Sequence, residues 1–221
     1  MPPVRCVLGL VVTAAVLTGC TQTVEGTARL AHTPALSSLD GVLLDAPEIN
    51  KIMGTSDMEV VESTQALTDT SADVSDTECI GALYHAEEVV YSDSGWGDLI
   101  DEIVTEPDAY GEHWVEQTAV RLPSREDAET FLAKTKETWT NCIGKSITID
   151  DHPDEFVWRF EGVSMDGASV SQTARQDDSD GWACRHVMRA AASLIIEVST
   201  CGETFDGEAD TIAERIAANA E

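Results

Sequence analysis

Hydrophobic and polar residues follow two different periods in the second half of the chain. Residues 113–122 (HWVEQTAVRL) alternate with a period of two, which is typical of a strand with one buried face. In residues 123–142 (PSREDAETFLAKTKETWTNC) apolar side chains recur every three or four positions, and Ser124 precedes Asp127 as in a capping box. This second segment is therefore predicted to be a helix. Its buried stripe is expected to comprise Ala128, Phe131, Leu132, Thr135 and Trp139.

The rest of the second half is predicted to form strands and one closing helix. Residues 183–202 (ACRHVMRAAASLIIEVSTCG) alternate after Ala192-Ser193, which places a hairpin turn near their middle. Residues 207–220 (GEADTIAERIAANA) have the apolar spacing of an amphipathic helix. Three more segments with strand patterns are residues 145–150, 155–163 and 169–176.

The first half is less regular. Residues 45–54 start with an aspartate that suits an N-cap and end with a glycine, so they predict a short helix. Residues 58–65 (MEVVESTQ) predict a strand, and residues 98–104 (DLIDEIV) are expected to be helical. Residues 79–91 (CIGALYHAEEVVY) fit a short helix or a helix followed by a strand. The pattern as a whole indicates an α+β (α/β) single domain, a mainly antiparallel sheet with helices packed on it.

The N-terminus follows the pattern of an export signal. Arg5 supplies a positive charge, and residues 7–17 form an apolar run that is shorter than the roughly 20 residues of a membrane-spanning helix. The run ends in Leu17-Thr18-Gly19-Cys20, which resembles the bacterial lipobox. The resemblance implies cleavage before Cys20 and acylation of its thiol.

This motif divides the chain into three parts. Residues 1–19 are expected to be a lipoprotein signal peptide, residues 20–38 the lipidated cysteine with a flexible tether, and residues 39–221 the folded domain. The mature protein is expected to be a lipoprotein on the extracytoplasmic face of the cell membrane. Acyl chains such as palmitate on Cys20 would hold it there. An ordinary signal peptide with a chance cysteine at the cleavage point is the alternative.

The cysteines divide by this scheme as well. Cys6 leaves with the signal peptide and Cys20 takes the lipid, so four of the six cysteines remain in an oxidising compartment. None of these four forms the close C-x₂₋₄-C pair of a zinc site, so no metal and no cofactor are expected. The four are Cys79, Cys142, Cys184 and Cys201.

Four cysteines allow three disulfide pairings. The predicted hairpin places Cys184 opposite Cys201, close enough for a disulfide bond. Cys79 and Cys142 then remain for each other, so two disulfides are expected.

The charge of the chain is strongly negative. The formal net charge is −28, and residues 52–120 contain 17 aspartates and glutamates but no lysine or arginine. Such a surface repels nucleic acid and anionic head groups, so we expect no nucleic-acid partner. A solvated, non-adhesive surface is the simpler interpretation, and a cationic partner is the alternative.

Catalytic motifs are not found in the sequence. There is no H-E-x-x-H pair and no G-x-S-x-G elbow, and His186 has no nucleophile implied beside it. The hypothesis is therefore that the protein is not an enzyme. An envelope hydrolase with an unrecognised site remains an alternative.

Aromatic and basic residues are the better candidates for a binding site. Tyr91 and Trp96 flank a glycine-containing loop and Trp114 begins a predicted strand, so these three are expected to line a cleft. The alternative for Trp96 is that it covers the edge of the core. Arg185 and Arg189 could neutralise an anionic ligand, or they could pair with the surplus carboxylates.

At this level the chain resembles the family of PknH-like extracellular sensor domains of actinobacterial Ser/Thr kinases, also found on free-standing lipoproteins. The four cysteines agree with that family in order and spacing. The other segments that carry the resemblance are residues 43–54 (LLDAPEINKIMG), 78–83 (ECIGAL), 90–99 (VYSDSGWGDL), 115–142 and 182–202.

The resemblance implies one α/β domain with a mainly antiparallel sheet, the two disulfides argued above, and a solvent-exposed ligand cleft. No kinase pattern is found in these residues, so the domain is expected to bind what a sensor binds without transmitting a signal itself. The hypothesis is a membrane-anchored, non-catalytic module for an unknown small molecule or envelope protein. A structural or partner-docking lipoprotein is the further alternative.

Overall fold

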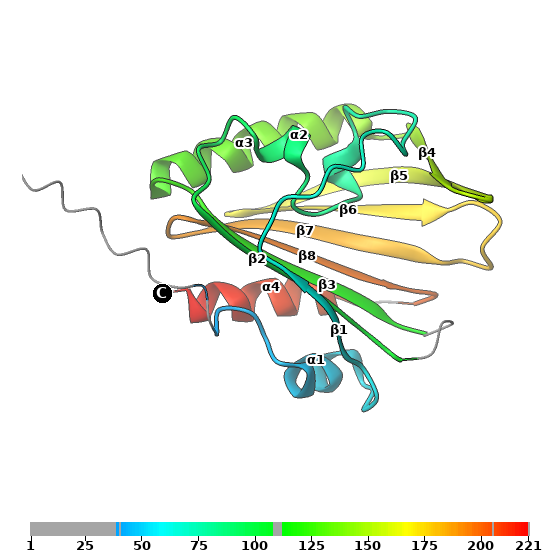
Figure 1. Ribbon diagram of the computed structural model, residues 1–221, viewed down its shortest axis with the longest axis horizontal. Helices are drawn as coiled ribbons and strands as arrows, with labels where there is room; N and C mark the ends of the chain where they lie inside the picture. Colours follow the sequence, from blue (N-terminus) through cyan, green and yellow to red (C-terminus); the bar gives the residue numbers. More distant parts are fainter. Residues whose placement is uncertain (1–38, 40, 108–111, 205, 221) are drawn as a thin grey trace, which may run out of the picture. The chain divides into compact units, whose positions relative to one another are not determined.

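An antiparallel sheet forms the centre of the structure, a computed structural model that describes residues 39, 41–107, 112–204 and 206–220. The eight strands of these residues pair in the order β1-β2-β3-β8-β7-β6-β5-β4 (Figure 1). They are β1 (Glu59–Thr64), β2 (Asp98–Thr105), β3 (Trp114–Arg121), β4 (Ser146–Asp151), β5 (Asp154–Asp166), β6 (Ser169–Gln176), β7 (Ala183–Ala191) and β8 (Leu194–Gly202).

Helices cover both faces of the sheet (Figure 1). One face carries α3 (Arg125–Cys142) together with the segment that contains the 3₁₀ helix η1 (Ile80–Ala82) and α2 (Glu88–Tyr91). The other face carries α1 (Ala46–Met53) and α4 (Glu208–Asn219). The expected α+β fold, an antiparallel sheet with packed helices, is therefore confirmed.

Each face of the sheet has its own hydrophobic core. Ile212 and Ile216 of α4 pack on the face that presents Val198, while Leu132 and Trp139 of α3 pack on the opposite face. The buried stripe predicted for α3 is confirmed, although Phe131 is only partly buried. The two cores follow from strand alternation, because successive residues of the central strands point to opposite helices.

The predicted helix starts are confirmed. The Asp45 carboxylate accepts a hydrogen bond from the Glu48 N–H at 2.9 Å and begins α1. The Ser124 hydroxyl accepts one from the Asp127 N–H at 3.1 Å and begins α3. Gly54 ends α1 with φ of 76°, a left-handed conformation that glycine adopts without a steric penalty.

One prediction was wrong: residues 98–104 form strand β2 and not a helix. Their β-branched residues favour a strand, and β2 pairs along its length with β3 and also with β1. Pairing on both sides satisfies the backbone and overrides the weak local helix signal. The alternatives left open for residues 79–91 are also decided, because the segment contains two short helices and no strand.

All described elements belong to one compact unit, Leu36–Glu221. The predictions for the signal peptide, for Cys20 and for the tether fall outside the described residues. Within the part of the chain that the structure describes, no helix is both long and apolar enough to cross a membrane.

Candidate functional site

Two disulfides frame the face of the sheet that carries α3. Cys79 precedes η1 and is bonded to Cys142, the last residue of α3. Cys184 and Cys201 are register partners on β7 and β8 and are bonded to each other. Both pairs agree with the hairpin argument from the sequence. The first disulfide fixes the segment that contains η1 and α2 against α3, and a groove lies between them.

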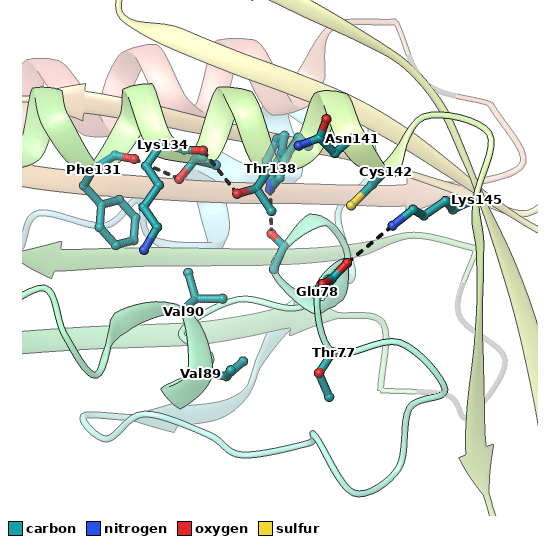
Figure 2. A pocket seen from close by; sticks show the side chains of 13 residues that line it. Thr77, Glu78, Val89, Val90, Phe131, Lys134, Thr138, Asn141, Cys142 and Lys145 are labelled. Carbon is teal, nitrogen blue, oxygen red and sulfur yellow. Dashed lines mark hydrogen bonds and ion pairs between the residues drawn. The ribbon is translucent and has the colours of Figure 1, made fainter.

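This groove has a volume of about 450 Å³. Figure 2 shows Phe131 and Lys134 extending from α3 toward Val90 of α2. The apolar part of the groove includes Val89, which is 52% exposed, a large fraction for a hydrophobic residue. The full lining is Thr77, Glu78, Gly81, Val89, Val90, Phe131, Lys134, Thr135, Thr138, Trp139, Asn141, Cys142 and Lys145.

Two lysines border the groove. Lys134 and Lys145 are two of only four lysines in a chain with a net charge of −28. The Lys145 ammonium lies 3.7 Å from the carboxylates of both Asp76 and Glu78, and the latter pair is drawn in Figure 2. The groove therefore combines an apolar wall with positive charge on an otherwise acidic molecule.

A second polar feature lies on the sheet itself, beneath α3 and the segment with η1 and α2. Two cross-strand rows bring polar side chains together on this face. Thr118 pairs with Asp101 and Glu197, and in the next row Ser199 pairs with Glu116 and His186. His85 and Tyr91 cover them. We call these residues the buried polar cluster: His85, Tyr91, Asp101, Glu116, Thr118, His186, Glu197 and Ser199.

Hydrogen bonds link most of the buried polar cluster. His85 Nδ1 lies 2.7 Å from Thr118 Oγ1, and His85 Nε2 lies 2.8 Å from Ser199 Oγ. The Thr118 hydroxyl in turn donates to the Asp101 carboxylate. Because the only proton of the Thr118 hydroxyl is donated to Asp101, Thr118 accepts a hydrogen bond from His85 Nδ1. The proton of the neutral imidazole is therefore on Nδ1, and Ser199 donates to Nε2.

Burial shifts the pKa values of His85, Asp101 and Glu116 in the direction that favours the neutral form of each. Burial and the nearby Glu197 carboxylate raise the pKa of Asp101 to about 6, although its hydrogen bond from Thr118 opposes the shift. Burial, followed by the charges of Asp101 and Glu197, raises the pKa of Glu116 well above its usual value. Burial and the adjacent His186 lower the pKa of His85.

His186 differs from its neighbours in its hydrogen bonding. It is 2% exposed and its ring stacks on that of His85 at 4.4 Å, yet neither ring nitrogen makes a hydrogen bond within the described residues. Its Nε2 does lie 3.2 Å from Glu197 Oε2, a distance suited to an ion pair but outside hydrogen-bond geometry. His186 is therefore a buried polar side chain whose hydrogen-bonding capacity is unused.

Comparison with known proteins shows the family to which this fold belongs. Residues 34–219 match the family model described as PknH-like extracellular domain. The chain belongs to the PknH-like extracellular domain family.

Two relatives are the serine/threonine-protein kinases PknH of Mycobacterium bovis and of Mycobacterium tuberculosis. Each is 30% identical to this chain over 178 residues, which is 80% of this chain but only 30% and 28% of the kinases. The crystal structure of the extracellular domain of PknH from Mycobacterium tuberculosis has a TM-score of 0.77 and 30% identity, covering 81% of this chain and 94% of that one. The similarity is therefore to the extracytoplasmic, non-kinase part of these proteins.

The PknH-like fold does not bring the five predicted ligand-binding residues together in the groove. Tyr91 is fully buried in α2, so the expectation that it lines an exposed cleft was wrong. Trp96 packs against the edge of the core, which was the alternative for it. Trp114 is partly buried at the start of β3, next to Cys201.

The two arginines share one face of β7 in this PknH-like domain, and that face carries α4. Arg185 Nε lies 2.7 Å from Asp210 Oδ2 on α4, so Arg185 pairs with a surplus carboxylate as the alternative stated. Arg189 lies four residues after Arg185 on the same face of β7 and is partly buried. Neither arginine lines the groove, which lies on the opposite face.

The residues of the buried polar cluster were not identified from the sequence. Glu116 and Thr118 lie on the same face of β3 as the core residue Val120. Glu197 likewise lies on the same face of β8 as the core residue Ile195. Acidic residues at core positions of a strand were the available signal. The PknH-like domain thus has two candidate regions, the groove on its surface and the cluster beneath.

Proposed function

We propose that this chain is a lipoprotein anchored to the extracytoplasmic face of the cell membrane through Cys20. Its PknH-like domain binds a small envelope molecule in the groove without catalysing a reaction. The groove carries this proposal, because a concave site with an apolar wall and a few charged groups is typical of small-molecule binding. An envelope protein docking on the same face is the competing possibility.

The lining of the groove favours a ligand with an apolar part and an anionic group. Val89, Val90 and Phe131 offer apolar contact, and Lys134 lies at the same wall as Phe131 (Figure 2). Ammonium groups bind phosphate and carboxylate through charge-assisted hydrogen bonds. Lys134 thus offers an anion a positive charge in the groove of a chain whose net charge is −28.

The Ser–His contact in the buried polar cluster does not support hydrolysis. Ser199 Oγ is 2.8 Å from His85 Nε2, but Ser199 is 1% exposed and lies within β8. Both neighbouring strands, β3 and β7, pair with β8 at this residue, so the local N–H groups are used in the sheet. A substrate would find neither access nor free oxyanion donors there.

Thermal denaturation of the Leu36–Glu221 unit tests the binding proposal. The crystallised extracellular domain of PknH shows that a relative of this unit folds separately. Octyl phosphate is expected to raise the melting temperature in a saturable manner, whereas 1-octanol at the same concentration is not. Replacing Lys134→Gln should weaken octyl phosphate binding about tenfold, the effect of losing one charged hydrogen bond.

Lys136→Gln is the matched control for this test. Lys136 is on the same helix but donates to the Gly167 carbonyl outside the groove. It should bind octyl phosphate like the unmodified domain. Equal stabilisation of all variants, or none at all, would argue against an anionic ligand in the groove and favour protein docking.

A further inference from the structure

We propose that the buried polar cluster binds one divalent transition-metal ion of the zinc type. The ligands are His85, Asp101 and Glu116, which we call the trio. One ligand atom from each of them lies within 4.8 Å of the other two. His85 comes from the segment between η1 and α2, Asp101 from β2 and Glu116 from β3, so the fold brings together residues that are distant in sequence.

The spacing of the trio is close to that of a coordination sphere. Zinc binds nitrogen and carboxylate oxygen at about 2.0–2.2 Å, so two ligands of one ion lie about 3–4 Å apart. His85 Nδ1 and Glu116 Oε2 are 4.0 Å apart, and ligation would use the other tautomer of His85, in which Nε2 donates to Ser199 and Nδ1 is unprotonated. The ligand atoms of the trio, within 4.8 Å of one another, would have to move closer to bind one ion, and Glu116 is the most exposed of the three.

The charge of the site also favours a cation. Asp101, Glu116 and Glu197 are mutually close and largely removed from water. Within the described residues, no lysine or arginine forms an ion pair with any of these three carboxylates. Buried carboxylates are stable when they are paired or bound to a metal, and a divalent ion would supply positive charge to this group of carboxylates.

An independent observation comes from His186. This imidazole is 2% exposed, stacks on the ring of His85 and has no hydrogen bond to either nitrogen within the described residues. Buried polar side chains in native proteins are nearly always hydrogen-bonded. His186 thus has a 3.2 Å contact with Glu197 Oε2 and stacks on His85, and its unused hydrogen-bonding capacity indicates that this cluster accommodates a ligand.

The types of ligand atom narrow the choice of metal. An imidazole nitrogen with two carboxylates suits zinc, manganese, iron or cobalt, whereas magnesium and calcium prefer oxygen ligands alone. The side chain of Glu116 is 13% exposed and that of His85 is not exposed at all. Glu116 therefore offers the route by which an ion would reach the site.

Zinc titration of the full-length protein, with a chromophoric chelator as competitor, tests this assignment. The unmodified protein should bind one zinc ion per chain at the trio. Asp101→Asn and Glu116→Gln keep the shape of each side chain but remove a ligand charge, so each should weaken that binding by at least about a hundredfold. Circular dichroism in the presence of EDTA shows whether each variant is folded.

Two control variants separate ligation from general electrostatics. Glu102→Gln removes an acid next to Asp101 in sequence, on the opposite face of β2 where it contacts Gln117. Glu197→Gln removes a buried carboxylate of the same cluster that is outside the trio. Glu102→Gln should leave the zinc affinity unchanged, and Glu197→Gln should lower it by about tenfold, less than either trio variant.

Cobalt substitution gives a second readout that does not depend on variants. Bound at the trio, cobalt should show visible absorption bands of a nitrogen and oxygen site, without the near-ultraviolet thiolate band that Cys6 or Cys20 would produce. Equal zinc affinity in the unmodified protein and in both trio variants would overturn the proposal, as would a thiolate spectrum. None of the trio lines the groove, so these results are independent of the octyl phosphate test.

Discussion

Tyr91 shows how one hydroxyl group connects a surface helix to the interior of the sheet. The side chain is fully buried, and its hydroxyl donates to Glu197 Oε1 at 2.6 Å. Burial and the Glu197 carboxylate raise the pKa of Tyr91 well above its usual value, so the phenol remains protonated and continues to donate. The ring stacks on Phe131 of α3 at 4.7 Å. Tyr91 thus fixes α2 to the sheet and to α3 together.

Replacing Tyr91→Phe should lower the free energy of unfolding by about 1–3 kcal/mol. The substitution keeps the ring but leaves the buried Glu197 with one donor fewer, and an unsatisfied buried charged group is costly. Urea denaturation at neutral pH measures the effect.

Tyr84→Phe is the matched control. Tyr84 is half-buried, and its hydroxyl makes no hydrogen bond within the described residues. Its removal should change the unfolding free energy by less than about 0.5 kcal/mol. Equal losses for the two variants would show that the Tyr91 hydrogen bond contributes nothing specific.

For single residues, the sequence predicted the face of a strand on which a side chain lies better than it predicted the residues that contact that side chain. The alternation of residues 113–122 already places Glu116 and Thr118 on the same face as Val120. Nothing local indicates that His85 covers them, because segment 79–91 has no clear period and its packing depends on the distant Cys142. The prediction that Tyr91 lines a cleft is wrong for the same reason. Long-range packing, and not local pattern, decides these residues.

Among the elements, the two disulfides stabilise different kinds of structure. Cys184–Cys201 joins two strands that are already paired, and each has a second neighbour in the sheet. Cys79–Cys142 fixes an irregular segment against the end of α3. Their sequence separations are 17 and 63 residues. The longer loop gives the larger loss of conformational entropy in the unfolded chain.

Replacing both members of a pair by serine should therefore have unequal effects. The chain-entropy model gives a loss of about 4 kcal/mol for Cys79–Cys142 and about 3 kcal/mol for Cys184–Cys201. Denaturation under non-reducing conditions measures both. Removal of Cys79–Cys142 should also weaken octyl phosphate binding, because Cys142 lines the groove. The reverse order of stabilities would indicate that the hairpin depends on its crosslink.

The type of an element was predicted correctly where a clear hydrophobic period extends over many residues, as in α3 and in the hairpin of β7 and β8. Strand β2 shows the limit. Asp98 to Val104 places its apolar residues at positions compatible with either period, and the decision came from pairing with β1 and β3. A short segment with two suitable neighbours becomes a strand whatever its weak local preference.

At the scale of the whole molecule, the net charge bears on how the protein is held at a membrane. A chain with a net charge of −28 is repelled by anionic lipid, and the acyl chains proposed on Cys20 would hold it at a membrane against that repulsion. The extracytoplasmic assignment follows from the family, whose described part is an extracellular domain. The anchor itself stays a prediction from the lipobox.

Replacing Cys20→Ala should release the protein from the membrane fraction. Without the thiol there is no acyl acceptor, and residues 7–17 are too few to span a bilayer. Cell fractionation followed by a carbonate wash measures the distribution. Cys6→Ala changes the other cysteine of the same segment and should leave membrane retention intact.

The two substitutions together distinguish the lipobox from an ordinary export signal. If Cys20 is a chance residue at a cleavage site, the unmodified protein is already released and neither substitution changes its distribution. If both variants stay in the membrane, some other contact must hold the domain there against its own charge. Only acylation of Cys20 predicts retention of the unmodified protein and of Cys6→Ala, with loss of Cys20→Ala alone, because attachment of the lipid anchor requires the Cys20 thiol.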